Sequence, residues 1–158
     1  MGHQNLRIAS RVEGRRFHVP EPQSGVYTGT KIPDPSGCLS VYSADEELPF
    51  APHRMFLIYD VPTGGMRCNH AHREQTQWIV CASGRIDVEI ETKDGIIRDT
   101  LSEPSRGVLL TPQSWLKLWF QEPNSSAVVL SSGLYDESEY IRDYDEFRSI
   151  IDGDVDQR

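Results

Sequence analysis

The sequence lacks a long apolar run, a paired set of cysteines and an excess of basic residues. A membrane-spanning helix needs roughly 20 consecutive apolar residues, and no stretch of the 158 residues approaches that length. Three cysteines cannot all pair, and none stands in a Cys-x-x-Cys motif, so reduced thiols are expected. The net charge of −8 argues against general nucleic-acid binding. The basic N-terminus has no apolar segment after it, which predicts no secretory signal and a cytoplasmic protein.

The remaining composition is that of one folded domain, with 37% hydrophobic and 25% charged residues. Residues 1–35 are rich in Gly, Pro and polar residues, with a short strand expected only at 26–28. We interpret them as an N-terminal arm that lies over the domain or over a partner subunit. Residues 36–152 are predicted to form a single domain that ends in a helix, and residues 153–158 a frayed tail.

Short strand-like segments separated by turn residues fill most of the domain. Residues 85–91 alternate, with Ile86, Val88 and Ile90 predicted to point inward and Asp87, Glu89 and Glu91 outward. Lys93-Asp94-Gly95 predicts a hairpin turn, because Asp-Gly tolerates the positive φ angles of a tight reversal. The other segments are 54–61, 76–82, 96–101, 107–111, 115–120 and 127–132. This spacing indicates an all-β sandwich or barrel.

Only the C-terminal part of the sequence has a helical pattern. Apolar residues recur there at intervals of three and four, after an acidic first turn. They are Tyr140, Ile141, Tyr144, Phe147, Ile150 and Ile151.

The candidate chemistry centres on His70 and His72. Residues two apart on a strand share a face, so both imidazoles are expected in one cavity. The neighbouring Cys68 is interpreted as a small, buried or half-buried residue rather than a nucleophile. Two histidines with an ordinary pKa near 6.5 suit general acid–base chemistry at neutral pH, such as proton abstraction beside a ketone.

The spacing around these histidines resembles the first signature of the cupin barrel. That signature runs through Gly64, His70, His72, Gln77 and Gly84, but metal-binding cupins have a glutamate where this chain has Gln77. An amide is a poor ligand for a divalent cation, and we expect no metal and no cofactor. Glu74 could offer a carboxylate oxygen to a metal, but it faces the same side as the histidines only if the strand is regular there.

The second cupin signature is degenerate. Gly107 and Pro112 are present, but Ser114 replaces a glycine and Lys117 stands near the position of the third histidine ligand. A protonated lysine has no lone pair for a metal, so a metal-dependent cupin such as a dioxygenase is the less favoured alternative.

Residues 37–150 as a whole are similar to the WxcM-like cupins, the nucleotide-sugar 3,4-ketoisomerases. The resemblance lies in Leu48-Pro49-Phe50, in Arg54 at the start of the strand that ends in Tyr59-Asp60, in Arg67-x-x-His70-Ala71-His72 and in Trp115. Its most specific part is Tyr135-Asp136-Glu137-x-Glu139-Tyr140-Ile141-Arg142-x-Tyr144-Asp145-x-Phe147.

This resemblance implies an all-β cupin jelly roll with a C-terminal α-helix, and a homodimer that exchanges N-terminal strands. It implies a metal-free isomerase that moves the ketone of a dTDP-linked 4-keto-6-deoxyhexose from C4 to C3 through an enediol. His72 then corresponds to the base that takes the C3 proton, and His70 to its partner in delivering the proton to C4. The candidate substrate-binding residues are Arg54, Arg67, Asn69, Gln77, Trp115 and Lys117.

Several alternatives stay open at the level of sequence. Arg54 either engages the substrate or forms an ion pair with a barrel carboxylate, and Trp115 either lines the pocket or fills the barrel. The chain departs from the family at Ser36, at Cys68 in a glycine position, and at Leu116 and Lys117 after the tryptophan. A catalytically altered cupin that only binds a nucleotide sugar is therefore the main alternative function.

Overall fold

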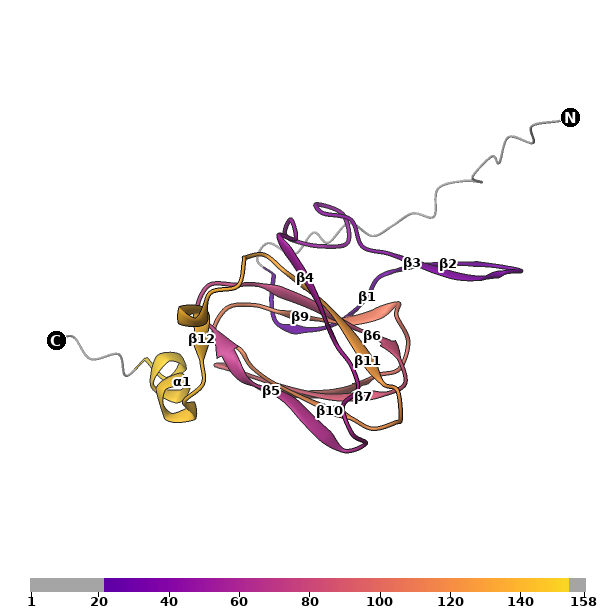
Figure 1. Cartoon of the computed structure of the whole chain (residues 1–158). Helices are drawn as coiled ribbons and strands as arrows, with labels where there is room; N and C mark the ends of the chain where they lie inside the picture. The colour runs from indigo at the N-terminus through magenta and orange to yellow at the C-terminus, as the bar shows by residue number, and fades with distance from the viewer. Residues whose placement is uncertain (1–21, 154–158) are drawn as a thin grey trace, which may run out of the picture.

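Two antiparallel five-stranded sheets face each other and form the body of the molecule (Figure 1). The computed structural model describes residues 22–153, so the predicted arm up to residue 21 and the predicted frayed tail from residue 154 lie outside the described residues. The first sheet has the order β1-β9-β6-β11-β4 and the second β12-β5-β10-β7-β8. A hairpin, β2-β3, extends away from them (Figure 1).

The described elements follow the chain in a simple order. The strands are β1 Gly25–Thr28, β2 Thr30–Asp34, β3 Gly37–Val41, β4 Arg54–Ile58, β5 Gly65–His72, β6 Gln77–Ser83, β7 Ile86–Thr92, β8 Gly95–Leu101, β9 Arg106–Leu110, β10 Trp115–Phe120, β11 Ser126–Ser131 and β12 Tyr140–Ile141. A 3₁₀ turn covers Glu137–Glu139, and helix α1 covers Tyr144–Ile151. The prediction of an all-β barrel with a C-terminal helix is confirmed.

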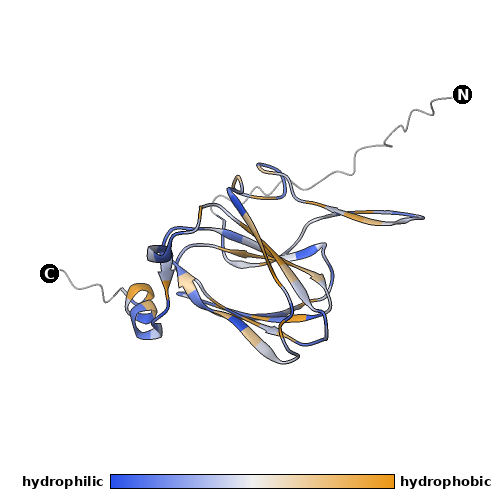
Figure 2. Cartoon of the chain, viewed as in Figure 1, coloured by the Kyte–Doolittle hydropathy of each residue, from blue (hydrophilic) through white to orange (hydrophobic). Residues whose placement is uncertain are grey.

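The main core fills the space between the two sheets. Ile86, Val88 and Ile90 are buried there, as the alternating pattern predicts. Facing residues of the other sheet, such as Ile79 and Val129, complete this core. Hydrophobic residues accordingly occur along the strands of both sheets (Figure 2). The packed core holds the strands that carry the polar side chains described below.

The β7–β8 hairpin turns at Lys93 and Asp94, as predicted, with Thr92 opposite Gly95. Glu91 lies on the outer face of β7, as predicted, yet it is only 7% exposed. Tyr144 and Arg148 of α1 donate hydrogen bonds of 2.9 Å to its carboxylate. Helix α1 therefore covers Glu91, and its side chains provide hydrogen bonds and a positive charge for the carboxylate.

The N-terminal part of the described chain joins the barrel earlier than the predicted domain boundary. β1 pairs with β9 of the same chain, from Gly25 opposite Leu109 to Thr28 opposite Arg106. The strand β2 was not predicted, because Lys31, Pro33 and Asp34 break its apolar pattern. Its pairing with β3 places the exposed Ile32 and Leu39 opposite each other on the projecting hairpin.

The predicted helix begins later than its sequence pattern. Tyr140 and Ile141 form β12, which pairs with the end of β5 through Tyr140 opposite His72 and Ile141 opposite Ala71. The helix begins at Tyr144 because the Asp143 side chain caps it by accepting from the Glu146 amide at 2.8 Å. The apolar spacing alone fits two structures equally well: a short buried strand at residues 140–141, or a helix that begins one turn earlier.

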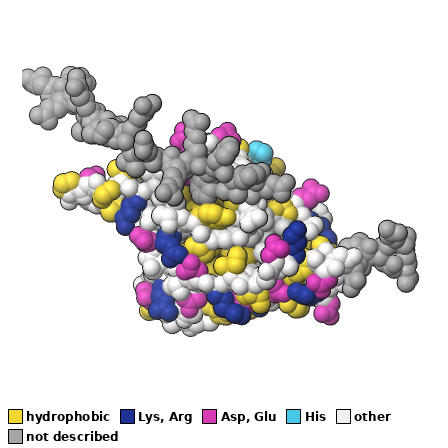
Figure 3. All heavy atoms as spheres, turned by 180° about the vertical axis from the view of Figure 1, so that it is seen from behind, with side chains coloured by type: hydrophobic (Ala, Val, Ile, Leu, Met, Phe, Trp, Pro, Cys, Tyr) yellow, Lys and Arg dark blue, Asp and Glu magenta, His cyan; other side chains and the backbone are white. Residues whose placement is uncertain are grey.

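The surface carries acidic and basic side chains in close alternation, as the view from behind shows (Figure 3). Within residues 22–153 no helix is long and apolar enough to cross a membrane.

Candidate active site

The two predicted histidines lie at the end of β5, at the mouth of the barrel. On the opposite sheet, Arg54, Ser131 and Gln77 stand in one cross-strand row, since Ser131 pairs with both of the others. Paired residues of a sheet share a face, so this row and the histidines enclose the same end of the barrel. The site is therefore built from both sheets.

The imidazoles contact each other edge to face. Their centroids are 5.0 Å apart at an interplanar angle of 80°. The ring of Tyr140, placed opposite His72 by β12, lies 4.9 Å from His70 and 4.6 Å from His72. The prediction that both histidines share one cavity is consistent with this geometry, and the tyrosine is an additional member of the cluster.

Gln77 holds His72 from the other sheet. Its amide nitrogen donates a buried hydrogen bond of 3.0 Å to Nε2 of His72. A neutral imidazole that accepts at Nε2 carries its proton on Nδ1. Within the described residues, Nδ1 of His72 is buried and has no hydrogen-bond partner. Gln77 thus fixes both the tautomer and the orientation of a ring that is 1% exposed.

Burial keeps both histidines neutral. Desolvation lowers the pKa of His72 from 6.5 to about 4, and the nearby His70 and Arg54 act in the same direction. Desolvation also lowers the pKa of His70, which is half-buried. Both imidazoles are therefore neutral at pH 7, as a proton-abstracting site requires, although the Nε2 lone pair of His72 is engaged by Gln77.

Arg54 supplies a positive charge to the same end of the barrel. Its guanidinium lies 5.1 Å from the Phe56 ring and 5.7 Å from the Tyr135 ring, and it donates to Gln75 at 3.4 Å. Among residues 22–153 it has no carboxylate partner, and its Nε is buried without a hydrogen-bond acceptor. The alternative of a barrel ion pair is thus not what this structure contains.

A bulge in β5 separates the histidines from the predicted residues before them. Cys68 and Asn69 have φ angles of 71° and 60°, and the pairing with β10 shifts there. Arg67 is exposed and precedes this bulge in β5. Burial raises the pKa of the Cys68 thiol to about 12, which agrees with a packing role rather than a nucleophilic one.

Trp115 and Lys117 point away from the histidines, to the outer face of the second sheet. Trp115 is 2% exposed and packs against Tyr144 and Phe147, while its indole nitrogen donates to Asn69 at 3.2 Å. Lys117 forms an ion pair of 3.0 Å with Glu89. The proposed place of Lys117 at a third ligand position is wrong, because the strand parity turns it outward.

The inward-facing neighbour is Leu116, which pairs with His70 and belongs to the apolar core. The floor below the histidines is therefore apolar.

Tyr140 and its neighbours were not singled out from the sequence as functional residues. The segment 135–142 passes over the histidines and is braced by polar contacts: Tyr135 and Arg142 both bind Glu137, and the Arg142 guanidinium lies 4.5 Å from the Tyr140 ring. Arg142 and Glu137 form an ion pair of 2.9 Å. The signal in the sequence was the long motif shared with the family, whereas the apolar spacing placed Tyr140 in the predicted helix.

The described residues contain no group of three or more His, Cys, Asp or Glu side chains that could hold a metal ion. Glu74 is exposed, and only its backbone amide contacts a neighbouring side chain, that of Glu139.

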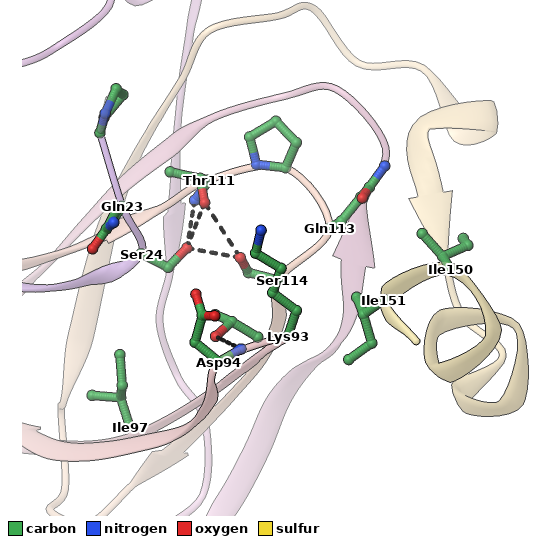
Figure 4. Close-up of a pocket in the computed structure, with 13 residues that line it drawn as sticks. Gln23, Ser24, Lys93, Asp94, Ile97, Thr111, Gln113, Ser114, Ile150 and Ile151 are labelled. Atoms are coloured by element: carbon green, nitrogen blue, oxygen red, sulfur yellow. Dashed lines mark hydrogen bonds between the residues drawn. The ribbon is translucent and has the colours of Figure 1, made fainter. Parts of the chain in front are cut away.

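A separate cavity of about 540 Å³ lies between the β7–β8 turn, the β9–β10 turn and α1 (Figure 4). The hydroxyls of Ser24, Thr111 and Ser114 are hydrogen-bonded to one another on its wall (Figure 4). None of the predicted site residues lines it. One residue of its lining contacts the histidine strand: the Gln113 amide donates to the His72 carbonyl oxygen at 2.7 Å.

Comparisons with known proteins agree with this geometry. The sequence profile described as "FdtA: WxcM-like, C-terminal" matches residues 12–152. The TDP-4-oxo-6-deoxy-alpha-D-glucose-3,4-oxoisomerase of Aneurinibacillus thermoaerophilus is 32% identical over 121 residues, which cover 77% of this chain and 87% of that protein. The fold is similar to that of QdtA, a sugar 3,4-ketoisomerase from Thermoanaerobacterium thermosaccharolyticum solved with TDP, with a TM-score of 0.78, 25% identity and coverage of 84% and 96% of the two chains. It is also similar to a 3,4-ketoisomerase from Helicobacter canadensis, with a TM-score of 0.77, 26% identity and coverage of 84% and 99%.

Proposed function

Because the chain belongs to the FdtA/WxcM-like family of cupin 3,4-ketoisomerases, we propose that it converts a TDP-linked 4-keto-6-deoxyhexose into the 3-keto sugar. The observation that carries this proposal is the pair of neutral imidazoles in contact at the barrel mouth, beside an arginine without a carboxylate partner. No metal or cofactor is required for proton transfer by imidazole.

The two histidines differ in what they can reach, and this sets their roles. His72 is 1% exposed, hydrogen-bonded to Gln77, and a weak base with a pKa of about 4. His70 is half-buried, so it is the more accessible of the two rings. We therefore assign His70 as the base that takes the C3 proton and returns it to C4, and His72 as the neighbour that keeps its ring in place. This reverses the division of roles that the sequence resemblance implied.

Arg54 is the group best placed to bind a negatively charged part of the substrate. A buried cation is costly unless a partner compensates it, and a diphosphate or a developing enediolate oxygen would provide that partner. Trp115 and Lys117 lie on the outer face of the sheet, Asn69 accepts from the Trp115 indole, and Arg67 is exposed on the other side of the bulge. For these four a direct contact with the reacting sugar is not part of the proposal.

We also propose a cytoplasmic homodimer. The exposed apolar residues of the β2-β3 hairpin and the open edge of β4 offer surfaces that a second copy would cover. The three cysteines are unpaired, which suits a reducing compartment.

The proposed activity is tested by offering the protein TDP-4-keto-6-deoxyglucose and identifying the product by NMR, with binding measured by calorimetry on the same preparation. Conversion to the 3-keto sugar supports the isomerase. Tight binding without conversion of this or any other 4-keto sugar would identify a nucleotide-sugar-binding protein instead.

A further inference from the structure

Tyr140 is the aromatic residue that the fold places nearest to both histidines. The antiparallel pairing of β12 with β5 puts it directly opposite His72, on the same face of the sheet. Its ring centroid is within 5 Å of both imidazole centroids, and the Arg142 guanidinium lies 4.5 Å from its ring centroid. A residue packed between two candidate bases and a cation is part of the reacting centre by position.

Hydrogen bonds outside the hydrophobic core hold the backbone around Tyr140. The Arg73 amide donates to the Glu139 carbonyl at 2.9 Å, and its guanidinium donates to the Ser138 carbonyl at 3.1 Å. The Glu139 carboxylate accepts from the amides of Glu74 and Gln75, each at 3.0 Å. This bracing holds the two-residue strand against β5, although a strand of that length is weak by itself.

The hydroxyl of Tyr140 has no hydrogen-bond partner among residues 22–153, while its neighbours along the same segment use theirs. Tyr135 donates to Glu137 at 2.6 Å and Tyr144 to Glu91 at 2.9 Å. Tyr140 is half-buried, and within the described residues no structural contact engages its hydroxyl. A phenol in this position is free to bond to a molecule that enters the barrel mouth.

The proposed isomerisation needs a group with these properties, and the inference rests on that proposed function. Moving a ketone from C4 to C3 transfers one proton between carbons and a second between oxygens. One imidazole can carry the carbon-bound proton. The oxygen-bound proton needs a separate donor and acceptor, and His72 is enclosed by Gln77 and the barrel wall.

We propose that Tyr140 is a third catalytic residue, which exchanges a proton with the two sugar oxygens. As His70 takes the proton from C3, the C3=C4 double bond forms, the C4=O π electrons move to oxygen, and this oxygen takes the phenolic proton. The enediol then gives its O3 proton to the Tyr140 phenolate, the C3=O bond forms, and His70 returns its proton to C4. The net change moves one hydrogen from C3 to C4 and one from O3 to O4, and both side chains are regenerated.

The test compares wild-type protein with Tyr140→Phe and the matched control Tyr144→Phe, using TDP-4-keto-6-deoxyglucose as the probe. Tyr140→Phe keeps the ring against the histidines and removes only the hydroxyl. We expect kcat to fall by about 10²-fold or more with KM within about threefold of wild type, since acid–base groups contribute about 10²–10⁴-fold. The rate at which the C3 proton signal disappears in D2O falls in parallel. Tyr144→Phe loses only a contact to Glu91 on the outer face and is expected to turn over like wild type.

Histidine titrations by NMR separate proton transfer from positioning. If Tyr140→Phe is slow and its histidines titrate as in wild type, the proposal is supported. If its histidine titrations shift together with the loss of rate, Tyr140 acts by positioning and the proton-transfer role is overturned. Wild-type kcat in Tyr140→Phe overturns the proposal and leaves the isomerase function intact. A wild-type protein that converts no 4-keto sugar overturns both.

Discussion

The burial of His72 has a measurable consequence for stability at mild acid. Its pKa is about 4 in the folded protein, and that of an unfolded histidine is about 6.5. Between these values the unfolded chain binds a proton that the folded protein does not. The free energy of unfolding therefore falls as the pH drops from 6.5 to 4, and this contribution levels off below pH 4. The linkage relation gives a loss of about 2 kcal/mol at pH 5 and about 3 kcal/mol at pH 4.

The measurement is urea unfolding at pH 7 and pH 5, followed by tryptophan fluorescence. His72→Gln removes the titrating ring, and a Gln amide reaches the position of Nε2. Other titrating groups are the same in both proteins and cancel in the comparison. Wild type is expected to lose about 2 kcal/mol more than His72→Gln between the two pH values. His53→Gln, a change at an exposed histidine, serves as the matched control and is expected to follow wild type.

Equal pH dependence in wild type and His72→Gln would refute the reasoning. The histidine would then titrate alike in the folded and unfolded states, and the arrangement of Gln77, His70 and Tyr140 around it would be wrong.

The remaining predictions concern the chemistry and the assembly. His70→Asn should lower turnover by about 10²–10⁴-fold with unchanged calorimetric affinity for the sugar nucleotide, and His72→Asn should lower it less; the reverse order would restore His72 as the base. Arg54→Met should weaken binding of the TDP-sugar about 10–100-fold, the usual effect of losing a charge-assisted hydrogen bond, and unchanged affinity would exclude Arg54 from the substrate site. Activity should survive exhaustive chelation; loss that one equivalent of a divalent ion restores would contradict a metal-free mechanism. Sedimentation at micromolar concentration should give about twice 17.9 kDa, and a monomer would count against a shared hairpin.

The fold was largely predictable because each strand of the barrel buries one face, and the period-two pattern of residues such as Ile86 and Val88 records that burial. The strand β2 escaped prediction because most of its residues project into solvent on the hairpin, where no core imposes a pattern. Tyr140 was assigned to the helix because its spacing from Tyr144 fits both a helix and a short strand followed by a turn. The choice between them depends on pairing with β5, a contact about 70 residues away in sequence that a local pattern cannot contain.

The site was predictable where it follows strand parity and unpredictable where parity breaks. His70 and His72 are two apart beyond the bulge, so both reach the barrel mouth. Arg67 was expected beside them, but the extra residue at Asn69 shifts the register and leaves it exposed. Cys68 occupies a position with positive φ, where a glycine would be unstrained. Its presence hid the bulge that a glycine would have indicated.

The central claim is that His70, held in place by His72, moves a proton between adjacent carbons of a keto sugar. The most direct measurement is NMR of TDP-4-keto-6-deoxyglucose incubated with the protein in D2O. The account predicts loss of the C3 proton signal and a product with its ketone at C3. C4 carries the transferred hydrogen, and deuterium only to the extent that the protonated His70 ring exchanges with D2O, and His70→Asn is expected to slow both changes by about 10²–10⁴-fold. A C3 proton that persists in the presence of active, substrate-binding protein would contradict it.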